Sequence, residues 1–167
     1  PQVVEEAAHA LGQIGAVSAR PALLALLQQP HPTSLEITVA DALSNLKEPE
    51  GLKMLTAALD KDDPEFKLRA ATLLLDHGSL AGAPALWERI GRANLSERAS
   101  LITIGQLAQA GDGRARQLLQ DTLAGTTDSK ARLFAAFSLA KLGDGRGRAE
   151  LTEAAAHPGA GQLLANQ

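Results

Sequence analysis

A repeat with a period of about 32 residues constrains the fold of this chain more than any other feature. The segment Gly-Asp-Gly-Arg-Gly-Arg at 143–148 matches Gly-Asp-Gly-Arg-Ala-Arg at 111–116. A leucine lies four residues before each of these two segments. At the same period it recurs along the chain, which gives the five repeat leucines Leu11, Leu43, Leu74, Leu107 and Leu139. Such self-similarity is typical of proteins built from stacked structural repeats.

Each repeat is predicted to contain two helices. Small-residue pairs such as Ala70-Ala71 and Ala135-Ala136 lie before the repeat leucine, and a second apolar set such as Leu23, Leu26 and Leu27 follows it. Spacings of three and four residues indicate helices rather than strands. We therefore predict an all-α solenoid, a superhelix of five antiparallel helix pairs within a single domain. The predicted repeats span residues 1–32, 33–63, 64–94, 95–127 and 128–157, followed by a tail at 158–167.

Glycines are predicted to end the first helix of four repeats, because the chain must turn left-handed to leave a helix. Lys47 occupies this position in repeat two, where Pro49 is expected to stop the helix instead. The glycines of 111–113 and 143–147 are interpreted as turn residues. A phosphate-binding loop would need a preceding strand and a Lys-Ser/Thr pair, which these segments lack.

Composition excludes several functional classes. The chain has 167 residues, a net charge of −3 and no cysteine. The charge argues against a general nucleic-acid surface, and the lack of cysteine excludes disulfides and thiol chemistry. No apolar run is long enough to span a membrane. Neither end shows the polar face of a capping repeat, so we expect this chain to be part of a longer protein.

The pattern resembles the short HEAT-like repeat of the phycobilisome-lyase type, over roughly residues 3–156. The resemblance rests on Ala7-Ala8-His9-Ala10-Leu11-Gly12 with Ala19-Arg20-Pro21-Ala22-Leu23, and on Ala81-Gly82-Ala83-Pro84-Ala85-Leu86. It implies that the second helices of the pairs form a concave binding layer and the first helices a convex layer. It also leaves open a lyase-like or enzyme-chaperone activity.

No catalytic, metal or cofactor site is predicted. The histidines His9, His31, His77 and His157 lack metal-ligand spacing, and no serine has a Ser-His-Asp context. The leading hypothesis is a non-catalytic scaffold that binds a protein partner. The alternatives are the lyase-like protein and a structural segment of a larger assembly.

One exposed stripe of the second helices supplies candidate partner-binding residues. Spacings of four place Arg20 with Leu24, and Arg116 with Gln120, on one face of their helices. Trp87, the only tryptophan, lies in the same column as Leu24, and tryptophan is frequent among interface hot spots. The alternative is that Trp87 packs onto a neighbouring helix.

Four arginines, Arg114, Arg116, Arg146 and Arg148, are predicted to form a basic edge at two helix N-termini. Arginine there opposes the helix dipole, so helix stability does not explain the pattern. The edge suits a partner with an acidic patch. The alternative is a solvated turn with local ion pairs to Asp112 and Asp144.

Phe134 and Phe137 are expected to face outward on the first helix of repeat five, because their columns elsewhere hold mostly polar or small residues. They provide a possible second contact. The alternatives are that these two side chains are covered by Leu163-Leu164 of the tail, by a following repeat or by another chain.

Overall fold

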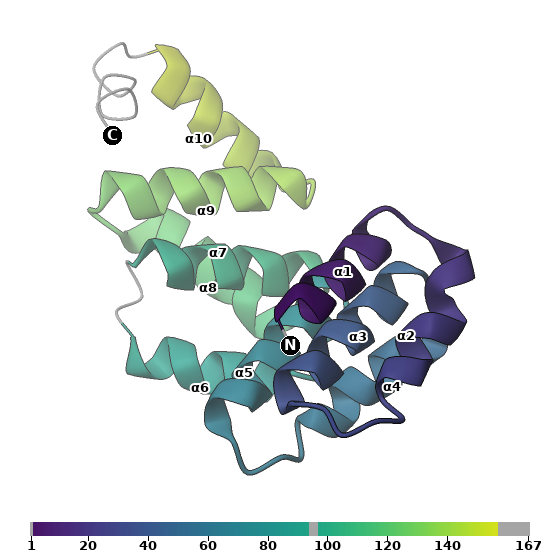
Figure 1. The fold of residues 1–167 in the computed structure, drawn as a ribbon. Helices are drawn as coiled ribbons and strands as arrows, with labels where there is room; N and C mark the ends of the chain where they lie inside the picture. Colours follow the sequence, from purple (N-terminus) through teal and green to yellow (C-terminus); the bar gives the residue numbers. More distant parts are fainter. Residues whose placement is uncertain (1, 94–96, 157–167) are drawn as a thin grey trace. The chain divides into compact units, whose positions relative to one another are not determined.

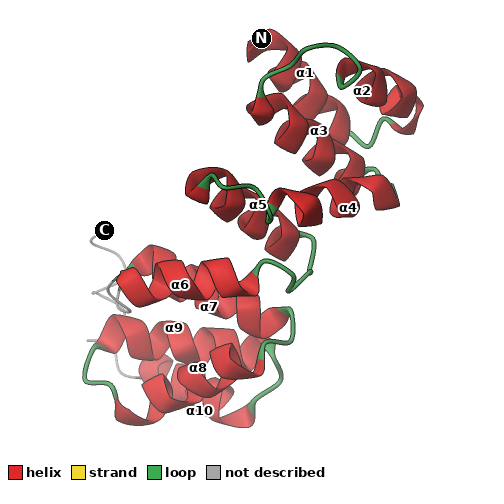
Figure 2. Ribbon diagram, turned by 90° about the horizontal axis from the view of Figure 1, so that it is seen from below, coloured by secondary structure: helices red, strands yellow, loops and turns green. Residues whose placement is uncertain are grey.

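A computed structural model of the chain describes residues 2–93 and 97–156, and this part is helical with no strand (Figures 1 and 2). In chain order its elements are α1 (Gln2–Gln13), the 3₁₀ helix η1 (Val17–Ala19), α2 (Arg20–Leu26), α3 (Thr33–Asn45), α4 (Pro49–Ala58), α5 (Pro64–Asp76), α6 (Ala83–Arg92), α7 (Arg98–Gln109), α8 (Gly113–Gly125), α9 (Ser129–Lys141) and α10 (Gly145–Ala156). The predicted all-α architecture of five helix pairs is confirmed. The predicted tail lies outside the described residues, as does His157.

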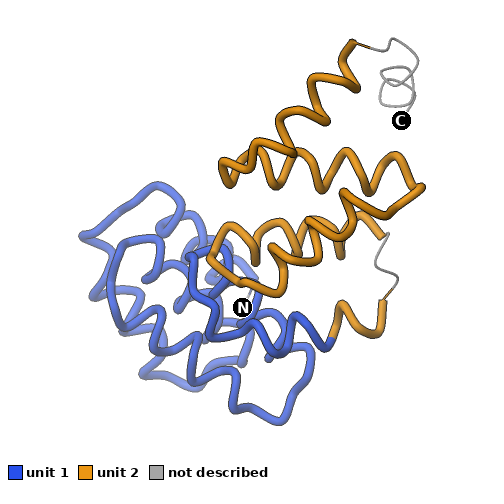
Figure 3. Tube along the Cα trace, turned by 180° about the vertical axis from the view of Figure 1, so that it is seen from behind, with its two compact units in different colours: residues 1–88 blue, residues 89–167 orange. Residues whose placement is uncertain are grey.

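The chain forms two compact units, residues 1–88 and 89–167, with the boundary inside α6 (Figure 3). In unit 1, α3 contacts α1, α2 and α4, and α4 contacts α5. In unit 2, α9 contacts α7, α8 and α10. Each unit therefore contains helices that contact their neighbours in the chain, as the repeat predicts.

The first helix of every repeat ends in the same backbone motif. A residue with positive φ follows each helix: Gly15, Lys47, Gly78, Gly111 and Gly143. The next amide donates a hydrogen bond to the carbonyl of the repeat leucine, as Glu48 N does to Leu43 O (2.9 Å) and Asp144 N does to Leu139 O (3.0 Å). This pattern is a Schellman motif, so the repeat leucine marks the helix end through its backbone as well as its side chain.

Lys47 corrects one prediction. It adopts φ 64° and closes α3 as the glycines close the other helices. Pro49 does not stop α3; it occupies the first turn of α4, where a missing amide costs nothing. A lysine in this left-handed conformation carries a steric cost that glycine avoids.

We expect Lys47→Gly to stabilise the protein by about 0.5–1 kcal/mol, since relief of the left-handed strain exceeds the added chain entropy of glycine. Urea denaturation measures the change. Lys47→Ala is the control, because it removes the charged side chain but keeps Cβ and should give no gain. Equal stabilisation by both variants would contradict the backbone explanation.

A second set of small residues permits close helix contacts within the pairs. The position eight residues after the repeat leucine holds Ala19, Gly51, Gly82, Ala115 and Gly147. A Cβ on Gly51 would meet the backbone and side chain of Ser44, and one on Gly147 would meet the carbonyl of Ala136. The interpretation of Gly147 as a turn residue is therefore wrong. Gly147 is a buried packing residue inside α10.

Candidate functional site

Two of the predicted partner-binding residues, Arg20 and Leu24, make contacts within unit 1. Arg20 Nε lies 2.9 Å from Glu48 Oε2, and its Nη2 donates a 3.0 Å hydrogen bond to Glu50. Leu24 is half-buried against the core cluster formed by helices α1 to α3. Both side chains join repeat one to repeat two, and their role in partner binding stays a prediction.

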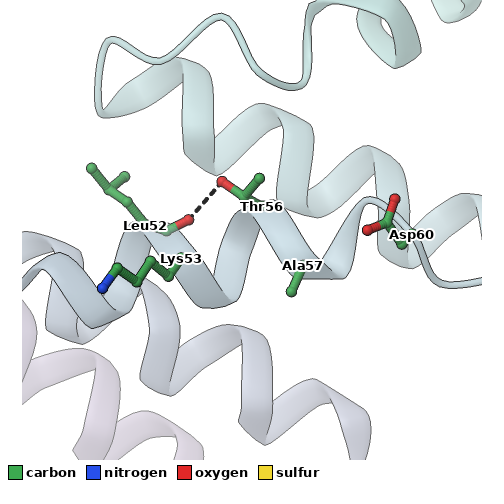
Figure 4. A pocket seen from close by; sticks show the side chains of 5 residues that line it. All are labelled: Leu52, Lys53, Thr56, Ala57 and Asp60. Atoms are coloured by element: carbon green, nitrogen blue, oxygen red, sulfur yellow. Dashed lines mark hydrogen bonds between the residues drawn. The ribbon is translucent and has the colours of Figure 1, made fainter.

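On α4 the columns of Arg20 and Leu24 hold Leu52 and Thr56, and both side chains are solvent-accessible. Leu52, Thr56 and Asp60 line a shallow, open depression of about 430 Å³ together with Lys53 and Ala57 (Figure 4). The Thr56 hydroxyl donates its hydrogen bond to the Leu52 carbonyl (2.8 Å). The depression follows a single helix face and does not enclose a volume, unlike a small-molecule site. Trp87 is half-buried on α6, and its role in partner binding stays a prediction.

In unit 2, Arg146 is held by the residue at the start of its own helix. Asp144 accepts hydrogen bonds from the Arg146 backbone amide (2.9 Å) and from its Nη2 (2.9 Å). These bonds, with a further one from Gln120, lower the pKa of Asp144 to about 2. The stabilisation that this carboxylate provides is therefore present above its unfolded pKa and is lost as the pH falls through about 2.

Arg132 is also matched within unit 2. From α9 it donates two hydrogen bonds to Glu150 of α10, at 2.7 and 2.9 Å. This pair lowers the pKa of Glu150. Arg132 and Arg146 are thus both committed to carboxylates of their own unit.

Arg116 and Arg148 differ from these two residues. Both are exposed, and neither pairs with a carboxylate among the described residues. Arg116 makes one long contact, from Nη2 to the Leu142 carbonyl (3.5 Å), and Gln120 of the same helix donates to Asp144 (3.3 Å). These contacts place α8 beside the turn that leads into α10.

The environment of Arg116 differs in charge from that of Arg20 at one of two equivalent positions. Both arginines lie nine residues after a repeat leucine and face the turn of the following repeat. Around Arg20 this turn supplies Glu48 and Glu50. Around Arg116 the equivalent positions hold Asp144 and Arg146. These two residues form an ion pair with each other. Arg116 therefore lacks the carboxylates that its counterpart has.

The two units also differ in net charge. Unit 1 has 6 basic and 12 acidic side chains, a net charge of −6, whereas unit 2 has 10 basic and 7 acidic side chains, a net charge of +3. The overall value of −3 hides this difference. Arg114 lies in the same first turn of α8 as Arg116 and is exposed, so the predicted basic edge belongs to the positive unit.

The two phenylalanines of α9 have different surroundings. Phe134 is half-buried, and its ring faces Gly105 of α7, where an added Cβ would lie 3.3 Å from the ring. The expectation that Phe134 faces outward is therefore wrong: it fills the space left by that glycine. Phe137 is 51% exposed, and Lys141 Nζ lies 5.3 Å from its ring centroid. The alternative of cover by Leu163-Leu164 falls outside the described residues.

A cluster that the sequence analysis missed joins the first helices of three repeats. His77 Nε2 lies 2.9 Å from Asp41 Oδ1, and His9 Nδ1 lies 3.8 Å from Asp41 Oδ2. The side chains of Asp41 and His77 are nearly buried. Comparing the repeat positions of His9, Asp41 and His77 could have pointed to this cluster. No residue next to either histidine in the sequence indicates the contact. Within residues 2–93 and 97–156 no group of three or more ligating side chains could hold a metal ion.

No described helix combines the length and apolar character that crossing a bilayer requires. The helix pairs, their shared end motif and the side-chain links between consecutive repeats define a helical-repeat protein of the α-α solenoid class. A family model described as HEAT repeats matches residues 1–76. This part of the chain is therefore similar to HEAT repeats, which generally mediate protein–protein interaction. The match does not distinguish the phycobilisome-lyase type. No curated protein and no solved structure gives a significant match.

Proposed function

We propose that the chain is a non-catalytic scaffold and that Arg116 and Arg148 of unit 2 bind an acidic segment of a protein partner. The protein-binding role follows the HEAT repeats. The choice of surface rests on the change from Glu50 to Arg146, which also engages Asp144 and leaves an exposed guanidinium at Arg116 where the equivalent Arg20 binds two glutamates.

The ion pairs of Arg20 indicate what such a partner would supply. A carboxylate placed beside Arg116 would reproduce the contact that Glu50 makes with Arg20. Arg148 occupies the same position in the next repeat, so two carboxylates on one segment could pair with both arginines. Arginine suits this role because its planar guanidinium binds carboxylates in a bidentate manner.

Each exposed ion pair contributes only about 0.2–1 kcal/mol, so this site alone should bind weakly and should depend on salt. Additional contacts from the rest of the partner would supply the remaining affinity. The arginines would then select acidic segments and speed their association.

The test is a fluorescence anisotropy titration with a labelled peptide of six glutamates at low ionic strength. We expect the wild-type chain to bind, the Arg116→Glu/Arg148→Glu variant to bind at least about tenfold more weakly through repulsion, and added salt to weaken wild-type binding. The matched control is Lys53→Glu/Lys130→Glu, which makes the same change in net charge at exposed positions of α4 and α9.

The control variant should retain most of the wild-type affinity. Equal loss in the two double variants would show that only the total charge matters and would overturn the site. A single-stranded DNA of six nucleotides serves as a second anionic probe. Equal or tighter binding of this DNA would overturn the proposal of a protein partner.

A further inference from the structure

Asp144 occupies a position from which, in unit 1, a carboxylate binds the arginine of the preceding repeat. It lies five residues after its repeat leucine, as Glu48 does in repeat two. Glu48 Oε2 is 2.9 Å from Arg20 Nε, and Arg20 is the counterpart of Arg116. The same two positions in unit 2 hold Asp144 and Arg116, but Asp144 pairs with a different arginine, the Arg146 of its own turn.

Two contacts place Asp144 beside Arg116. Arg116 Nη2 is 3.5 Å from the carbonyl of Leu142, two residues before Asp144. One helical turn after Arg116, Gln120 Nε2 donates a 3.3 Å hydrogen bond to Asp144 Oδ2. Residues four apart lie on the same face of a helix, so a rotation of the Arg116 side chain would bring its guanidinium to this carboxylate. Aspartate is one methylene shorter than the glutamate of repeat two, and the long side chain of arginine covers that difference.

Arg146 holds Asp144 in its present pairing. The backbone amide of Arg146 and its Nη2 each donate a 2.9 Å hydrogen bond to the carboxylate. The side-chain bond from Arg146 is also the largest cause of the lowered pKa of Asp144. The equivalent residue in repeat two is Glu50, which accepts a 3.0 Å hydrogen bond from Arg20. A glutamate at this position offers no donor to the neighbouring Glu48, which is left to pair with Arg20.

We infer that Arg146 is a positioning residue of the acidic-partner site: by engaging Asp144 it keeps the guanidinium of Arg116 available, and Asp144 is an intramolecular competitor for the carboxylate of a partner. Without the Arg146 guanidinium, Asp144 turns to Arg116 and closes the site, because a carboxylate of the same chain acts at a high effective concentration. The inference rests on the proposed function for the identity of the ligand, but the exchange of Asp144 between the two arginines is measurable without a ligand.

NMR measurement of the rotation of the Arg116 guanidinium about its Nε–Cζ bond tests this exchange at neutral pH. In the wild type we expect fast rotation, because Arg116 makes a single long contact. In Arg146→Gln the rotation should slow by about threefold, because an ion pair with Asp144 then restrains the guanidinium. Arg146→Gln/Asp144→Asn should restore the fast rotation, and asparagine still caps the helix. Equal rotation in the wild type and in Arg146→Gln would overturn the inference.

The consequence for binding is measured with the peptide of six glutamates, on two double variants of equal net charge. Arg146→Gln/Asp144→Asn removes the competitor. Arg146→Gln/Asp121→Asn instead neutralises an exposed carboxylate of α8, which accepts a hydrogen bond from Gln117. The first variant should bind the peptide about threefold more tightly than the second, because only the first leaves Arg116 without an internal carboxylate. Circular dichroism of each variant checks that the helices are retained.

The outcomes separate this inference from the proposed function. Equal affinity of the two double variants, while the wild type binds the peptide, would overturn the role of Arg146 and leave the proposed function standing. A wild type that does not bind the peptide would reject the proposed function and with it the role of Arg146 in binding, even if the rotation of Arg116 shows the exchange. Slower rotation in Arg146→Gln together with tighter binding by the variant that lacks Asp144 would establish both.

Discussion

Leu43→Ala should lower the free energy of unfolding by about 3 kcal/mol, within the range measured for large-to-small changes in protein cores. The Leu43 side chain is 0% exposed and lies in the cluster that joins α3 to the first repeat. The substitution leaves a cavity at the contact between the first and second helix pairs. The carbonyl of residue 43 keeps its bond from Glu48 N, so the loss comes from packing and not from the helix end. Chemical denaturation monitored by helix content measures it.

Leu11→Ala is the comparison that the repeat itself provides. Leu11 occupies the same column and its carbonyl accepts the same Schellman bond from Ala16 N (3.1 Å), but its side chain is only half-buried. We expect a loss of about 1 kcal/mol, because less apolar surface leaves water there on folding. Equal losses at the two positions would show that the column, and not the burial, determines the energy, and would contradict the structure.

The helix limits were predictable because local rules specify them. The period located five helix pairs, and the glycines that need positive φ located four of the helix ends. Asp112 accepts from Ala115 N at the start of α8, as its N-cap position predicts. Even Lys47 conforms to the motif, since the bonds after α3 form regardless of the residue type. A backbone motif that recurs with the repeat can thus be inferred at a position whose side chain does not favour it.

The surroundings of the candidate arginines were only partly predictable, because they depend on the following repeat. Arg20 and Arg116 share a column, yet one is paired with Glu48 and Glu50 and the other is not. The information that separates them lies about 30 residues downstream, in the change from Glu50 to Arg146. Comparing each arginine with the turn of the next repeat would have predicted that Arg20 is paired and that Arg116 is not.

Gly147→Ala should destabilise the protein by about 2–3 kcal/mol, although helix propensity alone predicts a gain of about 1 kcal/mol. The new Cβ would meet the Ala136 carbonyl oxygen and would lie 2.7 Å from Ala140 N, both in the backbone of α9. Backbone atoms cannot rotate away as a side chain can, so α10 must shift from α9. That shift also strains the pair of Arg132 with Glu150, which joins the same two helices. Thermal denaturation with a helix signal measures the change.

Gly145→Ala separates the packing cost from any general effect of glycine replacement in this segment. Gly145 lies two residues earlier, in the first turn of the same helix, and an added Cβ meets nothing within 4 Å. It should be neutral or stabilise by up to about 1 kcal/mol, because alanine restricts the unfolded chain. Opposite signs for two Gly→Ala changes in one helix would establish that residue 147 is small because α9 lies against it. Stabilisation by both substitutions would mean that α9 and α10 are not in the close contact that the structure shows at Gly147.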